Sequence, residues 1–159
     1  MHDTWETQYT ARANIYKILS HVYDIPNRGH TAYLDHIVEA AQSVSADLVP
    51  VAEQLVSEFI TADAEDLLEL RVDHARLFVG PFGMQAPPYA TLYQERAQPE
   101  SSDSTACLIA YYQESGLNLD EQFREAPDHI VAELEFMYYL IAQQLRTNDG
   151  SLREKQVEF

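Results

Sequence analysis

The stretch EAPDHIVAELEFMYYL, residues 125–140, places an aspartate beside a histidine, Asp128 and His129, directly after a proline. Such a pair can transfer protons, bind a metal ion, contact a ligand or begin a helix. Adjacent helical residues point about 100° apart, so the two side chains would not orient each other as a catalytic dyad. If a helix begins at Pro127, its electropositive start explains why an aspartate stands at position 128. That does not explain His129, which could pair with Glu133 one turn further on.

Metal-binding and nucleophilic chemistry find little support in the sequence. Glu125, His129 and Glu133 follow one another at intervals of four, but a two-metal helical bundle needs two Glu-x-x-His pairs and two further glutamates. Cys107, the only cysteine, lies within a helical pattern and is predicted to be buried and inert. Neither a Gly-x-Ser-x-Gly elbow nor a phosphate-binding loop is present. We therefore expect no enzyme and no cofactor, with a hydrolase or metal enzyme based on His129 and a glutamate as the alternative.

A second unusual segment, VGPFGMQAPPYATLYQERAQPESSDS at residues 79–104, holds four prolines and two glycines. It cannot be one long helix, and connections of this length inside a compact domain are often functional. Large apolar side chains accompany it: Phe78, Phe82, Met84, Tyr89 and Tyr93. Prolines and aromatic rings together predict a preformed groove for the apolar face of a peptide, although each ring could also pack inside the chain.

The elements that must position these residues follow a helical period almost throughout. Apolar side chains recur at intervals of three and four in segments 4–23, 31–44, 48–60, 63–78, 104–116 and 127–145. On segment 104–116 we expect Ala106, Ile109 and Ala110 to face inward, and on segment 127–145 the residues Ile130, Leu134, Met137 and Ile141. Since no run alternates as a strand does, the sequence predicts an all-α bundle and a single domain over residues 1–159.

Charge and composition limit the partners. The formal net charge of −16 argues against nucleic acid and anionic membranes as partners, because like charges repel, and it suits a cationic partner. No apolar run approaches the ~20 residues of a membrane span, and no signal peptide precedes Trp5. With one cysteine fitting a reducing compartment, we expect a cytoplasmic protein.

Two segments, LRVDHARLFVGPFGMQAPPYATLY and then EAPDHIVAELEFMYYL, resemble the TorD/DmsD/NarJ-type chaperones of molybdoenzyme maturation. The resemblance implies an all-helical, cytoplasmic, system-specific chaperone of anaerobic respiration. Such a chaperone binds the N-terminal, twin-arginine leader of a molybdopterin oxidoreductase subunit and assists cofactor insertion before export. Its partners would be that leader and the apo form of the enzyme. A NarJ-like assembly factor for a reductase that is not exported is the alternative.

Carried over by motif, the implied peptide-binding pocket comprises His74, Leu77, Phe78, Phe82, Pro88, Tyr89, Asp128 and His129, with Tyr23 added from the first helix. The acidic chain would attract the basic head of a leader, and Asp128, Glu125 or Glu133 would accept a guanidinium group. The aromatic segment would cover the apolar part of the leader.

The sequence departs from the family pattern at several points. His74 stands where relatives often have a large aromatic residue, and the chain ends where relatives usually add one or two helices. The final SLREKQVEF opens like a helix, with Ser151 and Glu154 at capping-box spacing, but about two turns are too short for a stable terminal helix unless it docks. We expect that the chain is cut short or hands this helix to a partner. We expect a monomer or a domain-swapped dimer.

Overall fold

The computed structural model of the protein describes residues 3–27, 29, 33–60, 64–80, 83–94 and 104–159. Every regular element in these ranges is a helix, which confirms the predicted all-α class. The elements are α1 (Asp3–Tyr23), α3 (Ile37–Val44), a 3-10 helix η1 (Ala46–Leu48), α4 (Val49–Ile60), α5 (Ala64–His74), a π-helix η2 (Ala75–Val79), α6 (Ala90–Gln94), α7 (Ser104–Glu114), α8 (Ile130–Thr147) and α9 (Ser151–Glu158).

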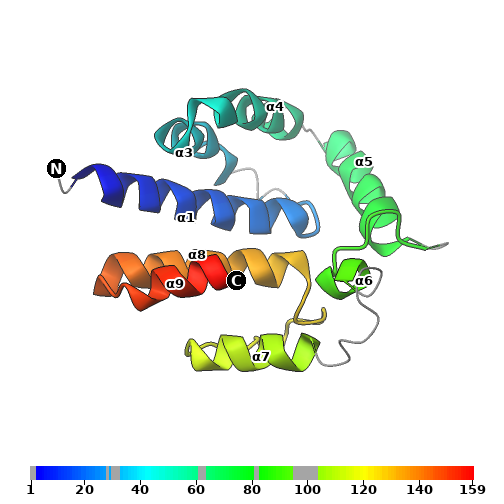
Figure 1. The fold of residues 1–159 in the computed structure, drawn as a ribbon. Helices are drawn as coiled ribbons and strands as arrows, with labels where there is room; N and C mark the ends of the chain where they lie inside the picture. Colours follow the sequence, from blue (N-terminus) through cyan, green and yellow to red (C-terminus); the bar gives the residue numbers. More distant parts are fainter. Residues whose placement is uncertain (1–2, 28, 30–32, 61–63, 81–82, 95–103) are drawn as a thin grey trace.

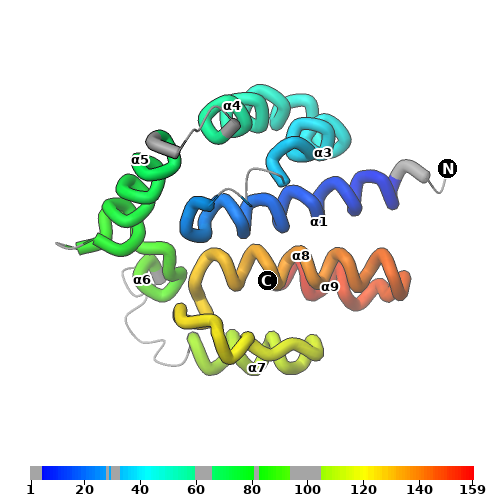
Figure 2. The backbone as a smooth tube through the Cα atoms, turned by 180° about the vertical axis from the view of Figure 1, so that it is seen from behind, coloured from blue at the N-terminus to red at the C-terminus, as the bar shows by residue number. Residues whose placement is uncertain are grey.

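The two longest helices, α1 and α8, lie side by side and antiparallel in the middle of the molecule, as Figures 1 and 2 show from opposite sides. Helices α3 and α4 lie beyond α1, and α7 lies on the opposite side, beyond α8 (Figure 1). The chain passes between these two halves through α5, η2 and α6 at one end of the α1–α8 pair.

The contact between α1 and α8 combines small residues, large apolar residues and one polar network. Ala13 of α1 is buried, and on α8 Leu140 and Ile141 are fully buried, at 0% exposure. Small residues let helices approach closely, and the aliphatic side chains then fill the interface. The predicted inward position of Ile141 is therefore confirmed.

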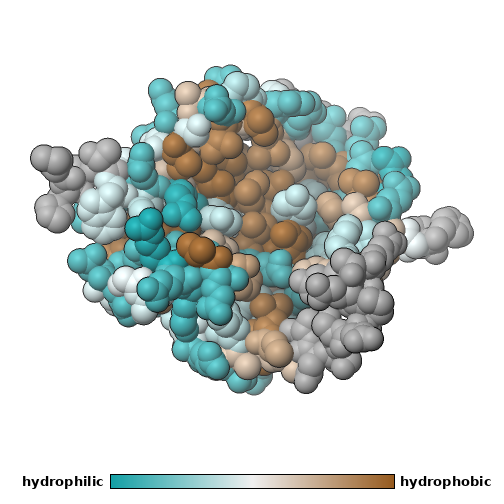
Figure 3. Space-filling model, in the orientation of Figure 1, coloured by the Kyte–Doolittle hydropathy of each residue, from teal (hydrophilic) through white to brown (hydrophobic). Residues whose placement is uncertain are grey.

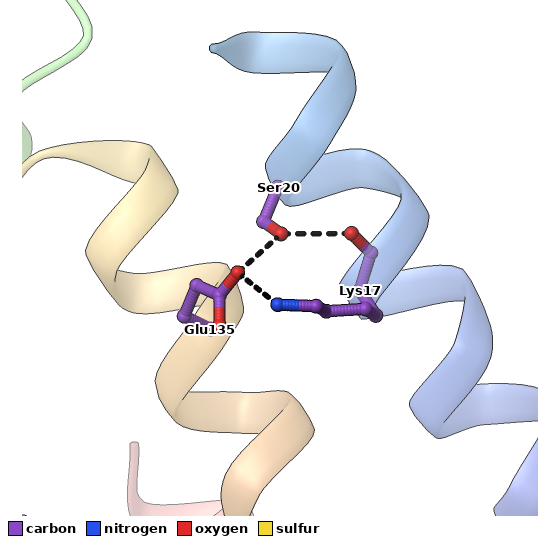
Figure 4. A network of polar contacts seen from close by, with 3 residues as sticks. All are labelled: Lys17, Ser20 and Glu135. Atoms are coloured by element: carbon purple, nitrogen blue, oxygen red, sulfur yellow. Dashed lines mark hydrogen bonds and ion pairs between the residues drawn. The ribbon is translucent and has the colours of Figure 1, made fainter. Parts of the chain in front are cut away.

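A glutamate of α8 ties the two helices together. Oε1 of Glu135 accepts a hydrogen bond from Lys17 Nζ over 2.6 Å and another from Ser20 Oγ over 2.9 Å (Figure 4). The same Ser20 hydroxyl lies 2.7 Å from the Lys17 carbonyl oxygen. This carboxylate thus finds both of its hydrogen-bond donors on α1.

Helix α7 buries a different face from the one predicted. Tyr112 is buried at 4% exposure in a cluster with Phe136, whereas Ala106 and Ala110 are exposed. An aromatic ring has far more apolar area to remove from water than a methyl group, so the face of α7 that carries Tyr112 is the one that is buried. Cys107 is exposed as well, so its predicted burial is wrong.

The short helix α9 docks on α8, as its length requires. Inside the contact, Nε2 of Gln156 donates to Oε1 of Gln144 over 2.7 Å. The Phe159 ring meets Phe136 edge-on, with ring centroids 4.9 Å apart.

The connection between α8 and α9 corrects one local prediction. Asn148 ends α8 in the left-handed conformation, with φ 54°, which asparagine tolerates better than most residues. Gly150 is then the N-cap residue of α9, and Asp149 Oδ1 accepts the N–H of Ser151. The predicted capping box at Ser151 is therefore wrong.

Figure 3 shows apolar residues gathered in a hollow on one face, over the space that α1, α4 and α5 enclose. Partly buried hydrophobic side chains border the core cluster of α1, α3 and α4: Val22, Val38, Leu55, Val56 and Phe59.

Among the described helices, none combines the length and the apolar character that a membrane crossing requires.

Candidate functional site

The segment before α6 is joined to the segment before α8. Residues 88–90 run antiparallel to residues 128–130, and two backbone hydrogen bonds connect them. The N–H of Ile130 donates to the carbonyl oxygen of Pro88 over 2.8 Å, and the N–H of Ala90 donates to that of Asp128 over 3.2 Å. The Pro-Pro-aromatic and Asp-His motifs, some 40 residues apart in sequence, therefore meet as a single structural unit.

Asp128 stabilises the start of α6, not the start of α8. Its carboxylate is buried at 4% exposure, and Oδ2 accepts from the N–H of Thr91 over 3.0 Å and from Thr91 Oγ1 over 2.6 Å. Such bonds are typical of a side chain that caps a helix N-terminus. The predicted helix start at Pro127 is wrong, because α8 begins at Ile130.

His129 is the N-cap residue of α8. Its backbone is extended, and Nδ1 accepts the N–H of Val131 over 3.2 Å. Burial lowers the pKa of His129, and the nearby carboxylates of Glu125 and Asp128 oppose that shift only in part. A lowered pKa keeps Nδ1 unprotonated near neutral pH, which is the form that can accept the capping hydrogen bond.

Tyr89 connects the aromatic segment to Glu125. Its hydroxyl donates to Glu125 Oε2 over 2.6 Å, and this bond is the main reason that the pKa of Tyr89 rises to about 12. The Tyr89 ring meets the His129 ring edge-on, with centroids 5.2 Å apart. Tyr89, Glu125 and His129 are thus one contact group.

The π-helix η2 presents Phe78 next to α1. The Phe78 ring lies 5.9 Å from the Tyr23 ring and 4.9 Å from the His74 ring. His74 Nε2 is 3.1 Å from the Tyr23 carbonyl oxygen, to which a protonated Nε2 donates. His74, where relatives often carry an aromatic residue, therefore holds α5 to the end of α1.

A tight turn follows η2. Gly80 has φ 53°, and a Cβ atom built there would lie 2.3 Å from the Gly83 carbonyl oxygen, so only glycine fits. The N–H of Ala86 returns to the carbonyl oxygen of Leu77 over 2.9 Å. Leu77 thereby fixes where the proline pair begins.

These elements enclose a cavity of about 370 Å³, which we call the aromatic cavity. It is lined by Tyr23, Phe78, Ala86, Pro87, Pro88, Tyr89, Ala90, Tyr93, Ile130 and Glu133. Five of the residues predicted from the sequence contribute directly to this lining: Tyr23, Phe78, Pro88, Tyr89 and Glu133.

A second cavity of about 380 Å³, which we call the acidic cavity, shares Ala90 and Glu133 with the first. Its lining is Ala90, Thr91, Cys107, Leu108, Tyr111, Asp128, Glu133, Glu158 and Phe159. Burial, with a smaller contribution from the Asp128 carboxylate, raises the pKa of Glu133. Glu133 makes no side-chain hydrogen bond or ion pair with any residue that the structure describes.

The remaining predicted residues support the cavities from outside or lie elsewhere. Asp128 lines only the acidic cavity, while His74, Leu77, Glu125 and His129 hold the lining segments in place. Phe82 lies outside the described residues. The sequence did not predict three residues of the acidic cavity: Thr91, Tyr111 and Glu158. Thr91 could have been found, because its hydroxyl lies two residues after the Pro-Pro-Tyr motif.

The chemistry available here is that of binding. No hydrogen bond between the side chains of Asp128 and His129 exists, because each serves a different helix start. Within the described ranges, no three His, Cys, Asp or Glu side chains converge as metal ligands would. The fold and the site together define a helical protein with a proline-aromatic cavity beside an acidic one.

This chain belongs to the family described as "Nitrate reductase delta subunit", whose model matches residues 39–159. The resemblance drawn from the two sequence motifs is thereby confirmed, since relatives named DmsD and TorD also match.

Three relatives illustrate the range of similarity. The perchlorate reductase assembly chaperone protein of Dechloromonas aromatica is 27% identical over 154 residues, 89% of this chain and 65% of that protein. The chaperone protein TorD of Shewanella pealeana is 27% identical over 143 residues, 81% and 64% of the two chains. The Tat proofreading chaperone DmsD of Salmonella typhimurium is 32% identical over 74 residues, 46% and 34%. The chain spans about a third to two thirds of the length of these relatives.

Proposed function

We propose that this protein is a non-enzymatic, system-specific chaperone for a molybdopterin-dependent oxidoreductase. It binds the N-terminal twin-arginine leader of the apo subunit and assists cofactor insertion and assembly before export. The observation that carries this proposal is the aromatic cavity, which the Pro88–Tyr89 and Asp128–His129 motifs build together.

The cavity suits the apolar part of a leader. Phe78, Pro88 and Tyr89 present rigid apolar surfaces that lose little conformational entropy when a peptide covers them. The backbone bridge and the Asp128 cap hold these surfaces before any ligand arrives. Preorganisation of this kind improves affinity because less ordering accompanies binding.

The charge of the protein suits the basic part of a leader. With 26 acidic and 10 basic residues, the chain attracts cationic segments over several ångströms and repels nucleic acid. Glu133 lies at the junction of the two cavities and can meet a guanidinium group. Asp128 and Glu125, the other two carboxylates predicted from the sequence, each use one oxygen to accept hydrogen bonds within the protein, from Thr91 and Tyr89 respectively.

The names of the relatives support two versions of this function. DmsD is a Tat proofreading chaperone, which favours a leader with a twin-arginine signal. The perchlorate reductase assembly chaperone covers 89% of this chain, which favours an assembly factor. A NarJ-like factor for a reductase that is not exported is therefore the second candidate function. We propose a cytoplasmic location and a single domain over residues 1–159 for either version.

Titration calorimetry tests the proposal. The probes are synthetic peptides with the leader sequences of the molybdopterin oxidoreductases of the same organism, each tested in turn. We expect micromolar or tighter binding that weakens as salt rises, because screening reduces the attraction between basic peptide and acidic protein.

A pair of variants locates the binding site. Phe78→Ala removes one wall of the aromatic cavity and is expected to weaken binding at least about tenfold. Val51→Ala on α4, which is 66% exposed, is the matched apolar control and should bind as the wild type does. Equal losses in both variants, or no binding of the leader to the wild type, contradict the proposal.

A further inference from the structure

The acidic cavity contains a carboxylate that receives no hydrogen bond from the part of the chain that the structure describes. Of its three carboxylates, Asp128 receives two hydrogen bonds from Thr91, and Glu158 lies 3.3 Å from the Tyr111 hydroxyl, which is also 3.1 Å from the Lys155 carbonyl oxygen. Glu133 has no such donor among the described residues. A half-buried carboxylate without a donor is unfavourable, since desolvation is not offset by a hydrogen bond.

The position of Glu133 is as informative as its lack of a partner. It lines both cavities, so one face of its environment is apolar and aromatic and the other is acidic. A ligand that fills the aromatic cavity with an apolar group would place its next residues beside Glu133.

We propose that the acidic cavity is a subsite for a basic side chain of the bound peptide, with Glu133 as its ion-pair partner and specificity-determining residue. One peptide segment then fills both cavities, with an apolar residue against Phe78 and Pro88 and a neighbouring basic residue at Glu133. This inference rests on the proposed function and specifies how the leader is read.

The walls of the acidic cavity favour arginine over lysine. The rings of Tyr111 and Phe159 line it together with the carboxylates, and Lys155 Nζ already lies 5.5 Å from the centre of the Tyr111 ring, which leaves the Phe159 ring for a second cation. A guanidinium group is planar, can stack on a ring and presents several donors at once, whereas an ammonium group is compact and strongly hydrated. An arginine can therefore contact a ring and pair with Glu133 in the same pose.

Binding of a basic side chain changes the protonation of the site. Because burial raises the pKa of Glu133, a fraction of this carboxyl binds a proton at mildly acidic pH, and an incoming guanidinium displaces that proton. Other titratable groups share the two linings: Tyr23, Tyr89, Tyr93, Cys107, Tyr111, Asp128 and Glu158. Proton release on peptide binding is therefore compared between the wild type and Glu133→Gln, and the difference is assigned to Glu133.

A double-mutant cycle between protein and peptide tests the inference. The peptides are the leader described above and the same leader with its arginines replaced by citrulline, an uncharged group of nearly the same shape. On the wild type, citrulline should weaken binding about ten- to a hundredfold, the range of a charged hydrogen bond. On Glu133→Gln, the two peptides should differ by less than about threefold.

The control is Glu121→Gln, which removes one charge from an exposed position outside both linings. It should keep the full preference for arginine. Loss of preference in Glu121→Gln as large as in Glu133→Gln overturns the inference, because net charge would then explain it.

The outcomes separate this inference from the proposed function. Equal affinity of the wild type for the arginine and citrulline peptides overturns the basic subsite and leaves the chaperone function standing. Failure of both peptides to bind overturns the two together. A persistent arginine preference in Glu133→Gln also overturns the role of Glu133. The comparison of the two leader peptides on the wild type needs no variant, so it stands even if Glu133→Gln does not fold.

Discussion

Two glutamates of α8, Glu133 and Glu135, are two residues apart and meet very different surroundings. Residues at this spacing on a helix point to nearly opposite sides. Glu135 faces α1 and accepts hydrogen bonds from Lys17 and Ser20 (Figure 4). Glu133 faces two cavities and has no hydrogen-bond donor among the described residues.

One side of the helix stabilises the fold, and we propose that the other side serves recognition. On the α1 side, Glu135 accepts hydrogen bonds from two residues of α1, so that side holds the two helices together. On the cavity side, a carboxylate with a raised pKa remains, which a cationic ligand would stabilise. The following predictions compare these two sides, from the largest expected effect to the smallest.

The largest effect is expected in the buried core that α8 shares with α1 and α7. Leu140→Ala removes a fully buried side chain and leaves a cavity, so it should lower the free energy of unfolding by about 2–5 kcal/mol. Urea denaturation measures the change. The folded fraction should still bind the leader peptide, and loss of affinity in correctly folded protein would show that this core and the cavities are not separate.

Substitution of Asp128 should lower both the stability of the protein and its affinity for the leader, with a smaller loss of stability than in Leu140→Ala. Asp128→Ala removes the acceptor of both Thr91 hydrogen bonds and leaves their donors without it, which costs about 1–3 kcal/mol of stability. It should also weaken leader binding, because α6 and the aromatic cavity lose their anchor. Thermal melting and calorimetry measure the two quantities, and a stability loss with unchanged affinity would restrict Asp128 to a capping role.

Glu135→Gln breaks the ion pair with Lys17 while keeping the size of the side chain. Both partners are about one third exposed or more, so the loss should be about 1 kcal/mol or less. Leader affinity should stay within about twofold of the wild type. A loss of arginine preference in this variant would contradict the contrast with Glu133.

Glu133→Gln should slightly stabilise the free protein, by up to about 1 kcal/mol at pH 7. The folded state holds its proton to higher pH than the unfolded state, so stability falls as pH rises above the usual Glu133 pKa of 4.5. Glutamine removes this loss, and the two proteins should be equally stable below that pH. Melting curves at several pH values check the sign, and a destabilised variant at pH 7 would contradict it.

The smallest effect concerns the His129 cap. Its pKa is lowered in the folded state, so the unfolded state binds the proton first as pH falls below the usual value of 6.5. Stability should therefore be complete above that pH and decline below it. Four groups also act on this ring: Glu125, Asp128, Asp24 and His74.

His129→Asn tests that cap directly. Asparagine keeps an acceptor for the N–H of Val131 but does not titrate. The decline of stability between pH 6.5 and pH 5 should become shallower, as melting temperatures would show. An unchanged slope would assign the decline to other groups.

Much of the fold and part of the site follow from residue patterns. The three- and four-residue spacing of apolar side chains predicts each main helix, and α8 buries the expected Met137 and Ile141. The Pro-Pro-Tyr motif predicts part of the lining of the aromatic cavity, because rigid and aromatic residues are typical of a preformed surface, whereas Asp128 and His129 lie outside that lining. Burial of Cys107 and of the alanine face of α7 was predicted wrongly, since periodicity alone does not say which face a neighbour covers.

By itself, the sequence determined the helical class, the acidic charge and the two motifs that form the site. Only the tertiary structure decided what each polar side chain does. Asp128 stabilises α6 instead of its own helix, Tyr89 occupies Glu125, and Glu133 remains open to two cavities. These roles depend on contacts between residues some 40 positions apart, and hydrogen bonds of that kind form only after the helices have packed.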